Sequence, residues 1–78
     1  MTNLEKYDRA FTRLFKVSKE ELPGMKYMGN DKWDSMAHMD LMSDLEEVFD
    51  IQISTIDVLD FTDYNKGKIV LSRYGVEI

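Results

Sequence analysis

The sequence predicts an all-helical fold, a compact antiparallel bundle of three longer helices and one short helix. Long stretches of the chain carry apolar residues at three- and four-residue spacing, which is the period of an amphipathic α-helix. Only residues 51–53 are expected to be extended, and they are too few to make a convincing strand. Because 78 residues supply one hydrophobic core, we expect a single domain over residues 1–78.

The first helix is expected from about residue 3 to residue 16. Thr2 and Glu5 stand three residues apart, which is the spacing of a capping box at a helix start. Five apolar residues recur on one face of this helix: Leu4, Tyr7, Phe11, Leu14 and Phe15.

The next segment contains the strongest local break in the chain, the pair Pro23-Gly24. Ser18 and Glu21 form a second possible capping box, which predicts one further helical turn before that break. Residues 24–33 have no regular period, although they include Met25, Tyr27, Met28 and Trp33. A loop of this length in so small a domain is either packed down by its own apolar side chains or functional.

The helical period returns from Ser35 to Phe49. Five apolar side chains fall within one arc that faces the core: Leu41, Met42, Leu45, Val48 and Phe49. One flank of this arc is acidic and consists of Asp40, Asp44 and Glu47. The side that points away from the core carries Met36, Met39, Ser43 and Glu46.

A short helix is expected after the extended residues 51–53. Ser54 and Asp57 have the spacing of a cap and its partner at a helix start. The apolar residues of this short helix are Ile56 and Leu59.

The last helix is expected to begin with Thr62 as its cap. Its apolar residues are Ile69 and Val70, together with Tyr64 and Tyr74. Gly67 is expected to interrupt this helix and Gly75 to end it, since glycine suits the left-handed turn at a helix C-terminus.

Composition and charge argue against several classes of function. The chain has no cysteine, so it holds neither a disulfide nor a thiolate zinc site. Residues 1–11 include the charged residues Glu5, Lys6, Asp8 and Arg9, so we expect no secretion signal. No run of about 20 apolar residues occurs, so we expect no membrane insertion and a cytoplasmic location. A formal net charge of -5 repels phosphate backbones and anionic lipids, so basic protein surfaces are better expected partners than nucleic acid or membranes.

Ser35 is the candidate functional residue. Serine and aspartate are favoured helix caps, so Asp34 and Ser35 taken alone indicate no more than a helix start. Ser35 also lacks the positioned base of a catalytic nucleophile, because His38 points to the core side and is expected to pack beneath the loop. A helix N-terminus favours an anion, so a phosphodiester on Ser35 would be stabilised there.

Met36 and Met39 are expected to lie exposed among acidic residues within one turn of Ser35. Scattered exposed apolar residues are common on protein surfaces, so the pair alone decides nothing. Methionine adapts to partners of different shape, however, and acidic rims steer basic surfaces toward it. This face is therefore a candidate docking site for several enzymes.

One extended motif runs from Asp34 to Ile53. It consists of Asp34-Ser35-Met36, then Leu41, then the spaced residues Leu45, Glu46, Glu47, Phe49, Ile51 and Ile53. With the helices around it, the motif resembles the acyl carrier protein family over about residues 3–74. In that family the serine receives 4'-phosphopantetheine from coenzyme A, and acyl groups are carried as thioesters on the thiol of the arm.

The resemblance implies that Ser35 is the attachment point, that the chain is not an enzyme, and that the fold is the family's four-helix bundle. Carried over by position, the partner-binding residues are Asp34, Met36, Met39, Asp40, Glu46 and Glu47. The implied partners are a phosphopantetheinyl transferase, an acyl- or aminoacyl-loading ligase and a downstream acyltransferase or synthase. We expect the chain to act as a monomer.

Two features depart from the fatty-acid carriers of the family. Those carriers usually have a glycine-containing lead-in to the serine, whereas this chain has Trp33 before Asp34, and Ala37 replaces the usual acidic residue. A tryptophan at this position makes the chain more similar to stand-alone carriers encoded in specialised biosynthetic clusters, including those for surface polysaccharides or secondary metabolites. The Asp34-Ser35-Met36 motif is also similar to that of D-alanyl carrier proteins, so the resemblance leaves acyl and aminoacyl cargo both open.

Two other functions are compatible with the same residues. A small helical binding module would hold another protein through the acidic, methionine-bearing face, with Ser35 serving only as a cap. A divalent-metal site could use Asp31, Asp34, Asp40 and Asp44, but their spacing is not that of an EF-hand loop. We therefore expect diffuse binding of calcium or magnesium to the acidic face and no specific metal site.

Overall fold

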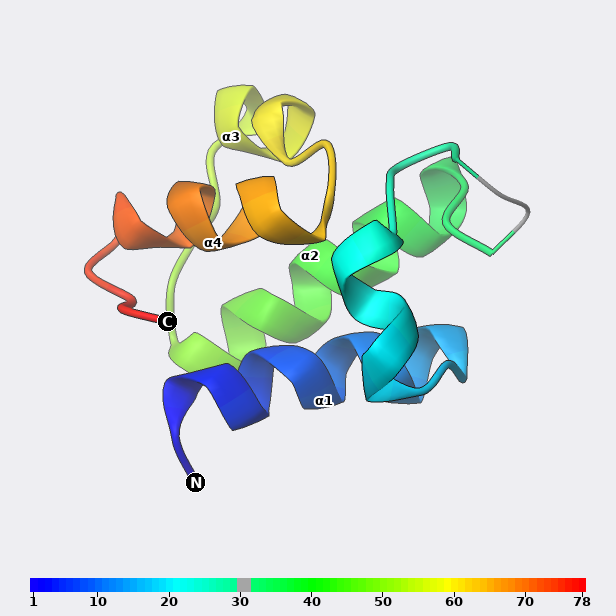
Figure 1. Ribbon diagram of the computed structural model, residues 1–78. Helices are drawn as coiled ribbons and strands as arrows, with labels where there is room; N and C mark the ends of the chain where they lie inside the picture. Colours follow the sequence, from blue (N-terminus) through cyan, green and yellow to red (C-terminus); the bar gives the residue numbers. More distant parts are fainter. Residues whose placement is uncertain (30–31) are drawn as a thin grey trace.

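The computed structural model describes residues 1–29 and 32–78. Its helices follow in the order α1 (Asn3–Phe15), the 3₁₀ helix η1 (Lys19–Gly24), α2 (Ser35–Phe49), α3 (Thr55–Asp60) and α4 (Tyr64–Ser72) (Figure 1). In this part of the chain there is no strand, and the β-type pairing is limited to an isolated bridge between Lys26 and Asp63. The prediction of a compact all-helical protein with three longer helices and one short helix is confirmed.

The helices pack in a small number of pairs. α2 returns along α1 in the opposite direction, and η1 lies against both α1 and α4 (Figure 1). α3 packs beside α4, and the two ends of the chain lie on the same side of the molecule. No helix in the described ranges is long and apolar enough to span a membrane.

α1 begins and ends close to the predicted residues. The Thr2 hydroxyl accepts a hydrogen bond from the Glu5 N–H at 3.1 Å, and the Glu5 carboxylate accepts one from the Thr2 N–H at 3.0 Å, which completes the capping box. The helix ends at Phe15, and the residue after it, Lys16, is the C-cap and has a left-handed φ of 55°. The predicted apolar face is buried through most of its length, but Leu4 in the first turn is exposed.

The core is rich in aromatic rings. Its aromatic members are Tyr7, Phe11, Phe15, Trp33, Phe61 and Tyr64. The ring centroids of Phe11 and Trp33 are 5.4 Å apart, in the edge-to-face arrangement that aromatic pairs favour. α3 contributes no fully buried residue to this core, and only Val58 of this helix packs against it while partly buried.

In the described part of the loop, residues 24–29 and 32–33, two apolar side chains pack into the core and Met28 is exposed, so packing, one of the two predicted alternatives, holds for part of this segment. Met25 and Trp33 are buried. The backbone N–H of Tyr27 donates to the carbonyl of Thr62 at 2.9 Å, which fastens the loop to the segment before α4. The loop therefore holds Trp33 in the core immediately before α2.

α4 differs from its prediction at its cap. Asp63 caps the helix instead of Thr62, because its Oδ1 atom accepts the N–H of Lys66 at 2.6 Å. The side chain of Ile69 is exposed, whereas that of Val70 is buried. The helix ends at Ser72, and the turn that follows includes Gly75 in the predicted left-handed conformation, with φ of 80°.

We expected Gly67 to interrupt α4 because glycine has a low helix propensity, and this prediction is wrong. The helix continues through it because the glycine permits close packing against two core rings. A Cβ atom at this position would lie 2.2 Å from the hydroxyl oxygen of Tyr7 and 2.2 Å from Cζ of Phe61. Gly67 thus lets α4 approach α1 closely.

Candidate functional site at the start of α2

The first residues of α2 have separate roles. Asp34 is the cap, since its Oδ1 atom accepts the N–H of Ala37 at 2.9 Å and its carbonyl accepts the N–H of His38 at 2.9 Å. Ser35 is the first residue of the helix and is exposed. The cap is therefore complete without the Ser35 side chain, and the hydroxyl is accessible from solvent.

The positive end of the α2 dipole lies at Ser35. Helix N-termini stabilise anions because backbone N–H groups in the first turn lack helical acceptors. A phosphate ester on the Ser35 oxygen would lie beside this end of the helix. The arrangement provides a modifiable hydroxyl in a position that suits a negatively charged group.

Trp33 and His38 connect the start of α2 to α3. The Trp33 indole Nε1–H donates to Nδ1 of His38 at 2.9 Å, and Nε2 of His38 lies 2.8 Å from the carbonyl oxygen of Val58. Indole nitrogen is only a donor, so Nδ1 of the imidazole is unprotonated and Nε2 carries the hydrogen that Val58 accepts. The imidazole is therefore neutral in this arrangement, and both of its nitrogens are engaged.

His38 is buried beneath the loop, as predicted. Its ring stacks on the Tyr27 ring with a centroid distance of 4.3 Å. An imidazole whose two nitrogens are already bonded cannot accept the Ser35 proton without losing one of these bonds. His38 is therefore not available as a general base for Ser35.

The predicted docking face is exposed. The side chains of Met36 and Met39 have 78% and 58% of their surface accessible. The other exposed predicted residues are Asp34, Asp40 and Glu47, and Ser43 is exposed beside them. These side chains together form an accessible surface of apolar and acidic groups along α2, which we call the α2 face.

Two residues of α2 lie elsewhere than their helical positions indicated. Glu46 is half-buried, because its Oε2 atom accepts the N–H of Ile53 at 2.8 Å and holds the segment after the helix. Val48, placed in the core arc, is exposed because it lines a groove opposite the small side chain of Ala10. Glu46 therefore has a structural role, and its partner-binding role stays a prediction.

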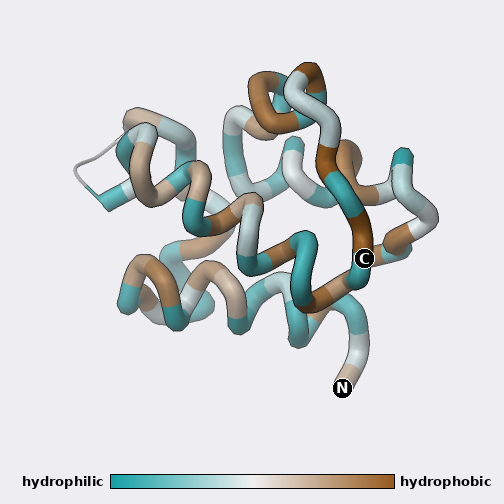
Figure 2. The backbone as a smooth tube through the Cα atoms, turned by 180° about the vertical axis from the view of Figure 1, so that it is seen from behind, coloured by the Kyte–Doolittle hydropathy of each residue, from teal (hydrophilic) through white to brown (hydrophobic). Residues whose placement is uncertain are grey.

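Two apolar residues of α3 are exposed, which the sequence did not indicate. Ile56 and Leu59 are 78% and 75% accessible, although α3 is one of the hydrophobic stretches of the chain in Figure 2. Apolar residues in a short helix ordinarily indicate a buried face, so the sequence contained no signal for this exposure. The bond from His38 to Val58 places α3 next to α2.

Polar groups of α4 and of the turn after it hold α3 in place. Arg73 bonds to Asp57 at 2.6 Å and to Asp60 at 2.7 Å, and the Tyr74 hydroxyl donates to the Asp57 carboxylate. The hydrogen bond from Tyr74 and the Arg73 guanidinium hold the pKa of Asp57 below its ordinary value. Arg73 likewise lowers the pKa of Asp60.

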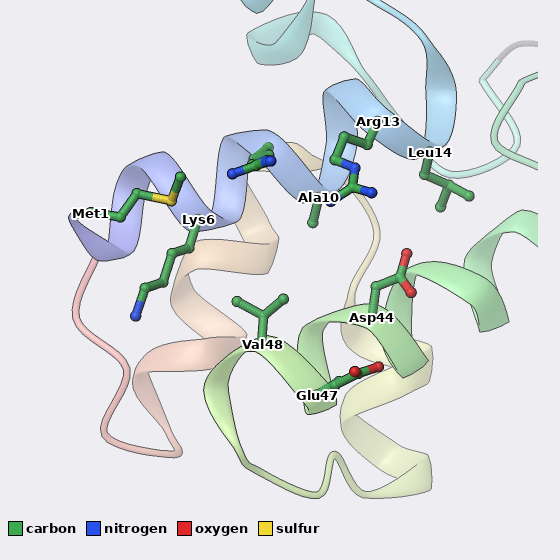
Figure 3. Close-up of a pocket in the computed structure, with 9 residues that line it drawn as sticks. Met1, Lys6, Ala10, Arg13, Leu14, Asp44, Glu47 and Val48 are labelled. Atoms are coloured by element: carbon green, nitrogen blue, oxygen red, sulfur yellow. The ribbon is translucent and has the colours of Figure 1, made fainter.

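A groove of about 650 Å³ lies between α1 and α2, away from Ser35 (Figure 3). α1 lines it with Lys6, Arg9 and Arg13, and α2 lines it with Asp44, Glu47 and Val48. Charges of opposite sign thus face each other across the groove. The groove lies along the C-terminal half of α2.

The residues of the metal-site alternative are only partly within the described ranges. No three histidine, aspartate or glutamate side chains there are grouped to hold a metal ion. Asp34 uses its carboxylate for the cap, and Asp31 lies outside the described residues.

Comparison of the chain with protein-family models, curated proteins and solved structures found no match.

Proposed function

We propose that the chain is an acyl carrier protein, without catalysis of its own, that carries acyl or aminoacyl thioesters on a 4'-phosphopantetheine arm attached to Ser35. The observation that carries this proposal is the exposed Ser35 hydroxyl at the start of α2, with capping performed by Asp34. The motif from Asp34 to Ile53 and the order of three longer helices and one short helix support it.

Attachment forms a bond between the Ser35 oxygen and the phosphorus of the arm. It breaks the pyrophosphate bond of coenzyme A and releases adenosine 3',5'-bisphosphate. The serine proton goes to a base of the transferase, since both nitrogens of His38 are engaged. The N-terminus of α2 stabilises the phosphodiester, and the arm supplies the thiol that holds the cargo.

The α2 face is the proposed surface for the partner enzymes. Its acidic residues, Asp40 and Glu47, steer basic surfaces, and Met36 and Met39 enter apolar pockets on the partner. The partners are the transferase, a loading ligase and a downstream acyltransferase or synthase, which the monomeric chain visits in turn.

We predict that Met39→Glu spares folding and weakens partner recognition, because Met39 is exposed on the α2 face. The matched variant Met42→Glu places a charge in the core, where Met42 is 2% accessible, and is expected to unfold the protein. Circular dichroism measures the fold, and the rate of modification by the transferase measures recognition. Loss of the helical spectrum in Met39→Glu would show that Met39 faces the core and not the solvent.

The test of the proposed function is direct modification. The purified protein is incubated with coenzyme A and a permissive phosphopantetheinyl transferase, and its intact mass is measured. The expected result is the mass of one arm added to the protein and mapped to Ser35, with no addition to Ser35→Ala. Failure of several transferases to modify the wild-type protein would refute carriage.

The second candidate is an unmodified helical binding module. The specific observation in its favour is exposed apolar area on two adjoining helices, at Met36 and Met39 of α2 and at Ile56 and Leu59 of α3. Such surfaces mark protein-binding sites when they are contiguous. The modification experiment separates the two candidates, since the module requires no change at Ser35.

A further inference from the structure

We propose that the cargo on Ser35 is a short or polar acyl group, aminoacyl groups included, that remains outside the helices. This inference rests on the proposed function and identifies the class of cargo that the site accepts. It is drawn from the side chains that fill the protein between Ser35 and the core.

A long alkyl chain gains stability when it leaves water, in proportion to the apolar area that is buried. A carrier of such a chain would therefore need an apolar space within reach of the attachment point. A chain that entered the core from the start of α2 on the side of α3 would pass His38, which is bonded to the Val58 carbonyl of α3.

That entrance is closed by two hydrogen bonds in series. Trp33 donates to His38, and His38 donates to the Val58 carbonyl of α3. A chain entering between the two helices would separate these groups. Buried donors and acceptors left without partners are costly, so the bonds oppose opening.

The space behind the entrance is filled by aromatic rings. Trp33 is fully buried, and its ring lies 5.4 to 6.4 Å, centroid to centroid, from five other rings: Phe11, Phe15, Tyr27, His38 and Phe61. Interiors of this kind are close-packed, so a chain could enter only by displacing Trp33. The same residue precedes Asp34 directly and holds the start of α2 against the core.

The groove between α1 and α2 is not a substitute for an apolar space. It lies along the half of α2 remote from Ser35, and charged side chains of both signs line it beside the apolar residues Met1, Ala10, Leu14 and Val48 (Figure 3). An alkyl chain placed there would remove charged groups from water without giving them partners. A short or polar acyl group needs no such space, because it is stable in water.

The test compares cargoes of different length on the same arm. A permissive transferase loads the wild-type protein from acetyl-, β-alanyl- or octanoyl-coenzyme A, and intact mass confirms each product. The melting temperature is then measured for each form. The indole N–H signal of Trp33, the single tryptophan, is recorded by NMR as a reporter of the core.

The expected melting temperatures of the three loaded forms agree within about 2 °C, and the indole signal does not move. A rise of more than about 2 °C in the octanoyl form relative to the acetyl form, with a displaced indole signal, would overturn the inference while leaving the carrier function intact. Absence of loading from every donor would refute the carrier function itself, and the inference with it.

Trp33→Leu supplies a positive control, because it opens space beneath Ser35 and removes the bond to His38. In this variant, octanoyl loading is expected to raise the melting temperature above that of the acetyl form. Equal melting temperatures in a folded variant would show that Trp33 is not what excludes the chain. If the variant does not fold, the wild-type series alone decides.

Discussion

Asp34 and Ser35 are adjacent in sequence but differ in what their side chains do. The Asp34 carboxylate is bonded to the backbone of α2, whereas the Ser35 side chain is exposed. Both residue types are common helix caps, so sequence alone left their roles interchangeable. The geometry of one hydrogen bond distinguishes them.

We predict that Asp34→Ala lowers the free energy of unfolding by about 1 kcal/mol, because it removes the α2 cap. Ser35→Ala is expected to change it by less than about 0.5 kcal/mol, since exposed residues outside such features contribute little. Urea denaturation followed by circular dichroism measures both. Equal losses in the two variants would mean that Ser35 shares in the cap.

Asp8 is a residue whose environment could not be read from the sequence. It is buried, and the Tyr64 hydroxyl donates to its carboxylate, while the Tyr7 hydroxyl donates to the Tyr64 carbonyl at 2.6 Å. Burial raises the pKa of both tyrosines. These partners lie more than fifty residues apart, so no local pattern indicates the network.

At the scale of the element, α4 shows how tertiary packing overrides helix propensity. Glycine is unfavourable inside a helix by roughly 1 kcal/mol relative to alanine. α4 nevertheless continues through Gly67, because any side chain there would collide with Tyr7 and Phe61. The neighbouring rings of the core, and not the helix itself, therefore determine that residue 67 is a glycine.

Gly67→Ala is therefore expected to destabilise the protein by about 1 to 3 kcal/mol, the usual cost of overpacking a core. The matched control is Gly24→Ala, where a Cβ atom would meet nothing within 4 Å and φ is not positive. That variant is expected to be neutral or slightly stabilising. Thermal unfolding compares them, and a stabilised Gly67→Ala would contradict the close packing of α4.

α3 is an element held largely by charged and hydroxyl groups, since none of its residues is buried. Asp57 and Asp60 both bond to Arg73, and both have a pKa below the ordinary value of 3.8. A carboxylate with a lowered pKa in the folded state contributes stability above its ordinary pKa. That stability is lost as the pH falls through the folded pKa.

We predict that the melting temperature falls on acidification below about pH 4, and that Arg73→Gln reduces this fall. The matched control is Lys16→Gln, at an exposed position after α1 that does not line the charged groove, and it should leave the slope unchanged. Melting curves recorded between about pH 7 and pH 3 measure the effect. The same slope in Arg73→Gln and wild type would show that the contacts to α3 are not titrating.

At the scale of the whole molecule, excess negative charge acts against folding and, in the proposed function, favours partners with basic surfaces. The formal net charge is -5 in a chain of 78 residues, and the α2 face carries exposed acidic groups. Repulsion among such groups destabilises the compact state, while the same field attracts basic surfaces. One property thus affects both stability and recognition.

Millimolar magnesium or calcium is expected to raise the melting temperature by relieving this repulsion. The binding is diffuse, so single substitutions such as Asp40→Asn are expected to reduce the effect only slightly. A titration followed by thermal unfolding measures it, with sodium chloride at equal ionic strength as the control. An unchanged melting temperature throughout the titration would contradict the prediction.

The sequence by itself determined where the helices lie and which residue, Ser35, is the candidate functional residue. Local rules of period and capping apply within a few residues, so they located the start of α1, the extent of α2 and the exposed positions of Met36 and Met39. Ser35 was singled out by a resemblance to a known family, which was visible because the motif is contiguous in the chain.

Only the tertiary structure decided which contacts join distant segments. It assigned the cap to Asp34, directed Glu46 to the backbone of Ile53 and left the apolar residues of α3 exposed. It also buried the side chains of Trp33 and His38 and joined them by a hydrogen bond. Such contacts depend on how whole helices pack, and the periodicity of a single helix does not contain that information.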